Sequence, residues 1–244
     1  MIKQILKQLT RKKYIYIVER GNAAIDIISK RYNTILIPEE GGWIHYKKIS
    51  KETVKCNEAV IDLEDLKTKQ VDAFLYHQPG GYFAEQPTFE IHKICKEKNI
   101  VVIQDIAGSI GTDLVGNADI IIGSFGKWKL VDAGKGGFIA TDEELDVKEF
   151  TDEETLKIIE KKLLELPGRI KYLNEIKTKV IKDLKDYGIV KSHDQGIVII
   201  IKYKDEQEKS DIETYCQKND LEWTECPRYI RINEQAISIE IKRK

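Results

Sequence analysis

Short runs of apolar residues recur through the first 140 positions of the chain, and segments with helical spacing separate them. The runs are apolar on both faces, which is typical of strands buried in a parallel sheet. The segments between them place apolar residues three or four positions apart, as in an amphipathic helix. We therefore predict βαβ units and an α/β fold with a mostly parallel sheet flanked by helices. The predicted strands are Tyr14–Val18, Thr34–Ile37, Ala73–Tyr76, Ile100–Ile103 and Ala118–Ile122.

The pattern changes after Asp142, where charged helix-forming residues predominate. Residues Glu153–Asp186 predict long helices with one break at Pro167-Gly168, because proline lacks the N–H donor that a helix interior needs. The remaining segments predict a small C-terminal α+β domain. Its predicted elements are a strand at Gly196–Tyr203, a helix at Glu208–Lys218 and a strand pair at Tyr229–Ile232 and Ala236–Ile241. We expect a large domain at residues 1–145, connecting helices at 146–190 and the small domain at 191–244.

The charge balance gives no reason to expect a nucleic-acid or membrane partner. The 244 residues include 40 basic and 41 acidic side chains, and the basic segments near both ends are short. Cys56, Cys95, Cys216 and Cys226 form no CxxC pair and lack metal-ligand spacing, so we expect reduced thiols and no metal site. No long apolar run precedes the first basic cluster. We therefore expect a soluble, cytoplasmic protein without a secretory signal or a membrane span.

Polar residues follow two of the predicted strands at positions where their side chains can meet. Asp105 follows the strand at Ile100–Ile103, Ser124 follows the next strand, and Lys129 lies five residues beyond Ser124. Ligands of open α/β sheets bind outside the carboxyl ends of the strands, so we expect these side chains to face one crevice. A lysine, a carboxylate and a hydroxyl are groups that hold pyridoxal phosphate (PLP). Taken singly, a surface lysine and a helix-capping aspartate are the alternative explanations.

Two motifs in this stretch, QDIAGSIG and SFGKWKLVDAGKGGF, resemble the DegT/StrS-type sugar aminotransferases among the fold-type-I PLP enzymes. The resemblance implies that Lys129 is the Schiff-base lysine, that Asp105 is the partner of the pyridinium nitrogen and that Ser124 is a phosphate ligand. Lys127 does not have the required spacing from Ser124. The resemblance also implies a mostly parallel, seven-stranded-type sheet flanked by helices, with a small C-terminal α+β domain.

A helix start near residue 21 is a second candidate for contact with phosphate. Gly21, Asn22 and Ala23 follow the strand at Tyr14–Val18 and open a helical segment, and the N–H groups at a helix start attract anions. The resemblance assigns these three residues to the turn that holds the cofactor phosphate, although the family usually has threonine where Asn22 stands. An ordinary asparagine cap with a glycine turn explains the segment equally well.

Four further residues are candidates by their position in the chain. The resemblance implies that Trp43 stacks on the pyridine ring, and contact with a protein partner is the alternative. His77 either lies near the cofactor ring or fixes a turn. Arg228 and Arg231 stand where fold-type-I enzymes often present an arginine that binds the substrate carboxylate. A surface position is the alternative for both arginines.

Together these residues predict a PLP-dependent aminotransferase that acts on an amino donor and a small or sugar-like keto acceptor. By resemblance we also expect a homodimer. Gly108 departs from the family, which tends to have glutamine or histidine there, and the chain is short, with the loss falling after Gly137. Two alternatives therefore stay open: a cofactor-less relative that acts as a binding or regulatory subunit, and another PLP reaction such as that of a lyase or desulfurase. A desulfurase needs a reactive cysteine in a glycine-rich loop, and none follows Lys129.

Overall fold

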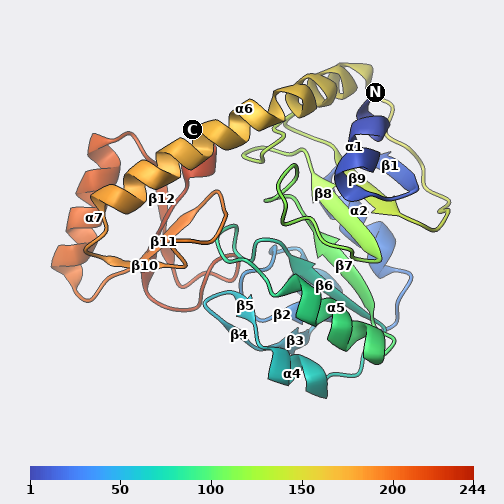
Figure 1. The fold of residues 1–244 in the computed structure, drawn as a ribbon, viewed down its shortest axis with the longest axis horizontal. Coiled ribbons are helices and arrows are strands. Elements are labelled where there is room, and N and C mark those ends of the chain that lie inside the picture. The colour runs from blue at the N-terminus through green and yellow to red at the C-terminus, as the bar shows by residue number, and fades with distance from the viewer.

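A seven-stranded sheet organises the larger of the two lobes of the molecule (Figure 1). The structure is a computed structural model that describes residues 1–244. Its strands follow one another across the sheet in the order β1, β9, β8, β7, β6, β2 and β3. Their bounds are β1 Tyr14–Val18, β2 Ile35–Pro38, β3 Glu52–Val54, β6 Ala73–His77, β7 Val101–Asp105, β8 Ile120–Ser124 and β9 Gly137–Thr141. All five strands predicted from the apolar runs are therefore present.

The direction of the strands confirms the predicted mostly parallel sheet. Strands β8, β7, β6, β2 and β3 pair in parallel, and β9 pairs antiparallel with β8 and β1. Every residue of β6 and of β9 is buried. Successive side chains of a strand point to opposite faces, so a strand that is covered on both faces is apolar throughout.

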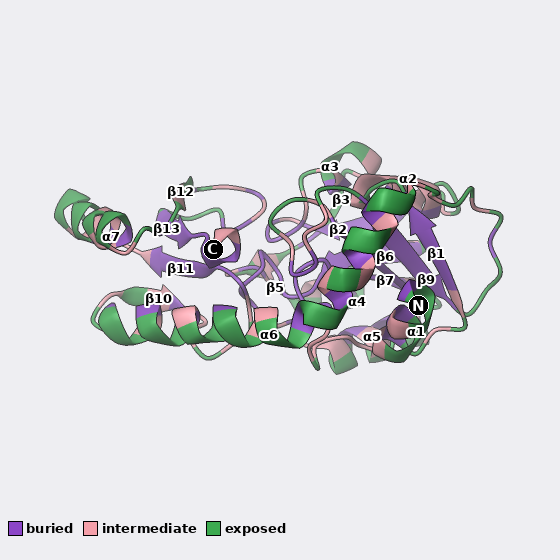
Figure 2. Ribbon diagram, turned by 90° about the horizontal axis from the view of Figure 1, so that it is seen from above, coloured by how far each residue is buried: buried purple, intermediate pink, exposed green.

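Helices cover both faces of this sheet. On one face Leu6 of α1, Leu66 of α4 and Ile91 of α5 belong to one apolar cluster. On the other face Ile25 of α2 and Tyr46 of α3 belong to a second cluster. Figure 2 shows the buried strands between these partly exposed helices. The helices are α1 Ile2–Thr10, α2 Gly21–Ser29, α3 Tyr46–Ile49, α4 Leu63–Thr68 and α5 Thr88–Glu97, and a small hairpin is formed by β4 Cys56–Asn57 and β5 Val60–Ile61.

The break expected at Pro167-Gly168 is wrong, because α6 is one continuous helix of 31 residues, Glu153–Asp183. Pro167 removes one backbone donor, but α6 has buried residues both before and after it in the sequence. Ile159 packs in the core of the large lobe and Val180 in that of the small lobe. Packing against both lobes outweighs one lost hydrogen bond, so α6 bridges them (Figure 1). No helix of the molecule is both long and apolar enough to cross a membrane.

A four-stranded antiparallel sheet forms the smaller lobe, in the order β10, β11, β13 and β12. Its elements are β10 Gly188–Val190, β11 Ile199–Lys202, α7 Glu206–Lys218, β12 Trp223–Cys226, β13 Ala236–Ile239 and the short 3-10 helix η1 Ile241–Arg243. The strand predicted at Tyr229–Ile232 is wrong. That segment turns back on itself through a hydrogen bond from Arg231 N to Arg228 O, and its Tyr229 carbonyl accepts a bond from Gly41 N. Residues Trp223–Cys226 pair with β13 instead.

Candidate active site

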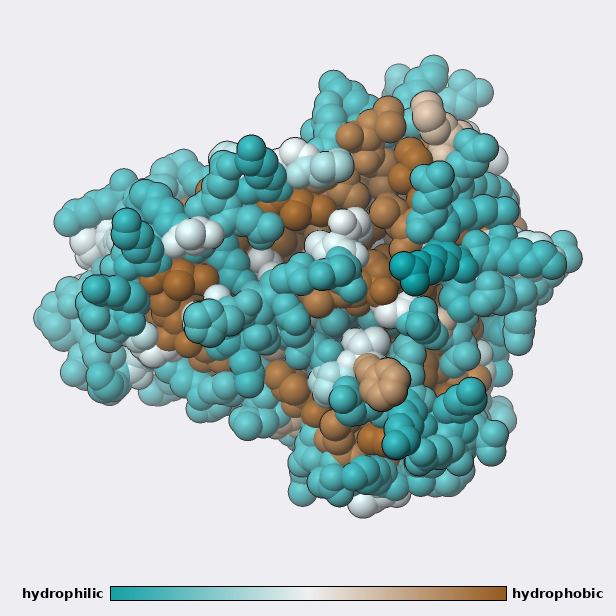
Figure 3. All heavy atoms as spheres, viewed as in Figure 1, coloured by the Kyte–Doolittle hydropathy of each residue, from teal (hydrophilic) through white to brown (hydrophobic).

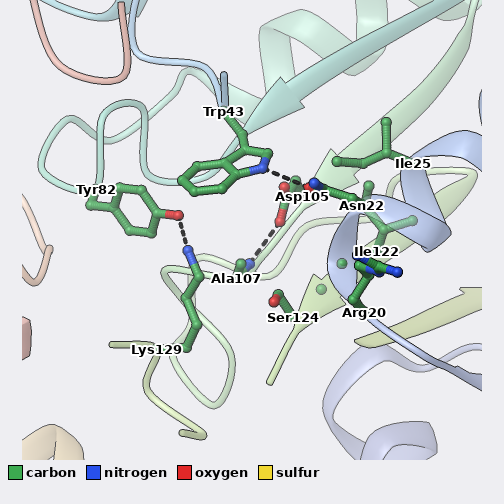
Figure 4. A pocket seen from close by; sticks show the side chains of 12 residues that line it. Arg20, Asn22, Ile25, Trp43, Tyr82, Asp105, Ala107, Ile122, Ser124 and Lys129 are labelled. Carbon is green, nitrogen blue, oxygen red and sulfur yellow. Dashed lines mark hydrogen bonds between the residues drawn. The ribbon is translucent and has the colours of Figure 1, made fainter. Parts of the chain in front are cut away.

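A cavity lies at the carboxyl ends of β7 and β8, where the sequence predicts the crevice. It encloses about 540 Å³, its open mouth included. Its walls come from the ends of strands, the start of α2 and several loops, and Figure 4 shows the side chains that line it. The predicted cofactor-binding residues among them are Gly21, Asn22, Trp43, Asp105, Ser124 and Lys129, and the other wall residues are Arg20, Ile25, Tyr82, Ala107, Ile122 and Gly123. Predicted Ala23 lies in the first turn of α2, outside these walls.

Two hydrogen bonds hold the Asp105 carboxylate at the end of β7. The Tyr46 hydroxyl donates to one oxygen at 2.8 Å, and the Ala107 N–H donates to the other at 2.9 Å. Burial and the nearby Asp105 raise the pKa of Tyr46 well above its ordinary value, so this hydroxyl keeps its proton. The carboxylate is 5% exposed and fixed in direction. Nothing in the sequence pattern singles out Tyr46, which lies 59 residues from Asp105 along the chain.

The start of α2 lies directly against Ser124. A Cβ atom at Gly21 would lie 2.7 Å from the Ser124 Cβ, so only glycine permits this approach. No side chain caps the helix start, and Arg20 at the N-cap is positively charged. Free N–H groups of the first helical turn and a hydroxyl thus lie at one end of the cavity, and Arg20, whose guanidinium pairs with Glu19, borders it. This combination binds a phosphate group well.

Asn22 and Trp43 form a pair at the same end of the cavity. The indole Nε1 of Trp43 donates a hydrogen bond to the Asn22 side-chain oxygen at 2.8 Å (Figure 4). The bond fixes the direction of the indole plane, which faces Lys129 with the Nζ atom 4.7 Å from the ring centre. Asn22, a departure from the family pattern, therefore orients the predicted stacking residue.

Lys129 extends into the cavity from the loop after β8. Its Nζ atom donates a hydrogen bond to the Tyr82 hydroxyl and lies 4.4 Å from the centre of the Tyr82 ring (Figure 4). The loop is held by the Asp132 carboxylate, which accepts a bond from the Trp128 N–H at 2.7 Å. Lys127 instead lies over the Trp128 ring, away from the cavity walls. The structure therefore presents Lys129, and not Lys127, to the cavity that Asp105 also lines.

His77 ends the strand next to Asp105, to which it is paired in the sheet. Its Nδ1 lies 2.6 Å from the Pro79 carbonyl, so Nδ1 carries the proton and donates it. Burial, partly offset by Asp105, lowers the pKa of His77 to about 4. The imidazole is therefore neutral at pH 7, and its buried Nε2 atom has no hydrogen-bond partner. Of the two predicted roles, the structure shows the bond that fixes the turn.

Tyr82 occupies the space beside Gly108. A Cβ atom at Gly108 would lie 2.8 Å from the Tyr82 Cδ1 and 3.3 Å from the His77 Cε1. The tyrosine ring thus fills the position toward which a larger residue 108 would point. Sequence reasoning missed Tyr82, and the glycine pair that precedes it was the only local signal of an unusual turn.

The two arginines expected to bind substrate do not line the cavity, and for Arg231 that role is wrong. Its guanidinium is 1% exposed and donates two hydrogen bonds of 2.7 Å from Nη2 to the Glu240 carboxylate. Burial raises the pKa of Glu240, but Arg231 and Lys242 outweigh burial and hold that pKa well below its ordinary value. Because Glu240 accepts these hydrogen bonds, the Arg231 guanidinium is not available to a substrate carboxylate. Arg228 is half-buried and lies outside the cavity walls.

The sequence matches two family models in succession. Residues 57–158 match the DegT/DnrJ/EryC1/StrS aminotransferase family, and residues 165–243 match the MJ1341 family C-terminal domain. The first match contains Asp105, Ser124 and Lys129, whereas Gly21 and Trp43 precede it. A comparison with curated proteins finds no match.

Solved structures of similar fold cover nearly the whole chain. 3-Amino-5-hydroxybenzoic acid synthase is 13% identical with a TM-score of 0.73, over 99% of this chain and 85% of that one. The E. coli GDP-4-keto-6-deoxy-D-mannose-3-dehydratase with bound hydrated PLP is 13% identical with a TM-score of 0.75, over 98% and 86%. A DegT/DnrJ/EryC1/StrS aminotransferase from Brucella abortus is 11% identical with a TM-score of 0.75, over 98% and 83%.

The chain therefore has the fold of the fold-type-I PLP-dependent transferases. Residues 57–158 match the model of the DegT/DnrJ/EryC1/StrS aminotransferase family, which confirms over that segment the resemblance drawn from the two motifs. The separate match of residues 165–243 agrees with the position of the two motifs, both of which lie before residue 139.

Proposed function

We propose that this protein binds PLP through Lys129 and acts as an aminotransferase on a small or sugar-like keto substrate. The observation that carries the proposal is the content of one cavity: a lysine amine, a fixed carboxylate, an aromatic face and an uncapped helix start beside a serine. Two of the structures with this fold support the substrate class, since one is a DegT-type aminotransferase and the other a dehydratase of a keto sugar nucleotide.

The residues present fit PLP by their chemistry. Gly21 lets the start of α2 lie against Ser124, which brings the uncapped N–H groups of the first helical turn beside the serine hydroxyl. Asp105, locked by Tyr46, would hold the protonated pyridine nitrogen. Trp43 would cover one face of the ring. The unpartnered Nε2 atom of His77 is a buried acceptor close by.

When bound, PLP supplies an electron sink that stabilises negative charge on the carbon next to the substrate nitrogen. The protein supplies position and proton transfer. The Nζ atom of Lys129 would hold the cofactor, and as a free amine it would accept and return the proton that the transfer of an amino group requires. Asp105 would keep a positive charge on the pyridine nitrogen, and the aromatic walls would exclude water from the reacting atoms.

A homodimer is part of the proposal. Two apolar residues beside the cavity-lining side chains are exposed, Ile44 at 52% next to Trp43 and Trp128 at 37% next to Lys129. Figure 3 shows apolar surface on one face of the molecule between hydrophilic side chains. Burial of such residues by a second copy would bring that copy next to the loops that carry Trp43 and Lys129.

The absorbance spectrum with added PLP, before and after borohydride reduction, tests the cofactor and its lysine together. We expect a yellow band that reduction makes permanent, and a mass increase located at residue 129. Lys129→Ala should lose both signals, whereas Lys127→Ala, a lysine of the same loop, should keep them. Protein that stays colourless and unlabelled would contradict the proposal. It would favour the second candidate, a cofactor-less binding subunit, to which the departure at Gly108 also points.

A further inference from the structure

Tyr82 sits in a backbone conformation that tyrosine rarely adopts. Its φ angle is +70° although it is not glycine, and the side chain is buried. Hydrogen bonds hold this conformation from both sides: Tyr82 N donates to Pro79 O at 3.0 Å, and Ile197 N of the small lobe donates to Tyr82 O at 2.9 Å. Residues kept in such conformations by their surroundings cluster at functional sites.

The surroundings of the Tyr82 ring are shaped for it. Gly108 leaves the space that the ring fills, since a Cβ atom there would lie 2.8 Å from the Cδ1 atom. On the side of the small lobe, Arg231 and Lys242 approach the ring to 5.2 and 4.6 Å from its centre. Both cations are paired with the buried Glu240. Packing and charge thus fix the ring in one orientation.

The fixed ring directs its hydroxyl at one atom. Lys129 Nζ donates a hydrogen bond to this hydroxyl, and the amine also lies over the Tyr82 and Trp43 rings. A free lysine side chain has several rotatable bonds and spreads its amine over many positions. Here the amine has a single set of partners, all of them in the cavity wall.

We propose that Tyr82 is the positioning residue for Lys129, and that its hydroxyl holds the amine in the direction from which it reacts. The ring of Tyr82, which comes from the β6–α5 loop, fills the space that a larger side chain at position 108 would enter. An effect of Tyr82 on the linkage of PLP to Lys129 rests on the proposed function. The positioning of the Lys129 amine by the Tyr82 hydroxyl does not.

The first test uses the cofactor-free protein. Trace acetylation followed by mass spectrometry gives the labelling of Lys129 relative to Lys127, which serves as an internal reference in the same loop. In Tyr82→Phe, which keeps the ring, we expect Lys129 labelling to rise about fivefold because the amine loses its hydrogen bond. Tyr76→Phe, which removes another buried hydroxyl, should leave the ratio unchanged. Equal labelling of Lys129 in the wild type and Tyr82→Phe overturns the proposal.

The second test measures the rate at which borohydride fixes PLP to Lys129, alongside the affinity for pyridoxine 5'-phosphate, which lacks the reactive aldehyde. In Tyr82→Phe we expect linkage to slow about tenfold, because the amine is no longer directed, while pyridoxine 5'-phosphate binds within about twofold of the wild type. A parallel loss of both overturns the positioning role, because it shows a general change of the cavity. If wild-type protein takes up no PLP yet the labelling ratio rises, the proposed function fails and the role of Tyr82 stands.

Discussion

The imidazole of His77 is a neutral group in the folded protein. Its pKa is lowered by burial to about 4, whereas an exposed histidine titrates near 6.5. Because Nδ1 already donates to Pro79, protonation would place a charge on Nε2, which has no partner. The His77 imidazole therefore binds a second proton more tightly in the unfolded chain than in the folded protein. The stability due to His77 is complete above pH 6.5 and is lost as the pH falls toward 4.

This difference in proton affinity predicts a pH-dependent stability. Between about pH 7 and about pH 4.5, the free energy of unfolding should fall by about 2 kcal/mol through His77 alone. Glutamine at position 77 does not titrate in this range. The free energy of unfolding of His77→Gln should therefore fall by about 2 kcal/mol less than that of the wild type. Urea unfolding of both proteins at the two pH values measures the difference. A gap between wild type and variant that is the same at both values would contradict a neutral buried imidazole.

Helix α2 and strand β8 meet at the point where the phosphate would bind. The first turn of α2 has no capping side chain, and its approach to Ser124 leaves no room for a Cβ atom at Gly21. The geometry of this end of the cavity therefore depends on two elements that are fixed by the sheet and by a single glycine. A displacement of the helix would separate its N–H groups from the hydroxyl.

Gly21→Ala should push α2 away from Ser124, because the new methyl group would lie 2.7 Å from the serine Cβ. We expect a loss of about 1–3 kcal/mol in the free energy of unfolding and a weaker affinity for pyridoxine 5'-phosphate. Gly168→Ala in α6 is the control, since a Cβ atom there meets nothing within 4 Å. That variant should keep its affinity and gain stability. Unchanged affinity in Gly21→Ala would place the anion elsewhere.

The two lobes are joined at the loops that carry the aromatic walls of the cavity. Gly41, two residues before Trp43, donates its N–H to Tyr229 O at 2.7 Å, and Tyr82 O accepts from Ile197 N. Behind Tyr82 lies the buried ion cluster of the small lobe, centred on Glu240. The small lobe thus supports the loops of the cavity wall through these two hydrogen bonds, while its Arg231 is buried in an ion pair with Glu240.

Glu240→Gln should leave Arg231 with an uncompensated buried charge. Removal of one partner of a buried ion pair costs about 3–5 kcal/mol, so we expect a loss of stability of that size. Glu225→Gln is the matched control, because Glu225 is exposed and pairs with Lys209 on the surface of the same lobe. Denaturant unfolding of both variants, with wild type as reference, gives the two changes. Equal small effects would mean that Glu240 does not carry a charge in the folded protein.

The sequence by itself determined the architecture of the large lobe and the centre of its site. Strands that are apolar on both faces require a layer on each side, which predicts a parallel sheet. The carboxyl ends of adjacent parallel strands share one edge, and this rule predicts that Asp105, Ser124 and Lys129 lie together. The motif around Asp105 also carried the family resemblance, which residues 57–158 bear out.

Only the tertiary structure decided which distant residues complete the site. Tyr46 and Tyr82 reach Asp105 and Lys129 across 59 and 47 residues of sequence, and no local pattern encodes such contacts. Arg231 looked available because its pairing with Glu240 depends on how one loop folds onto β13. The helix that continues through Pro167 has the same explanation: packing against two lobes, which a local propensity does not include, outweighs one missing donor.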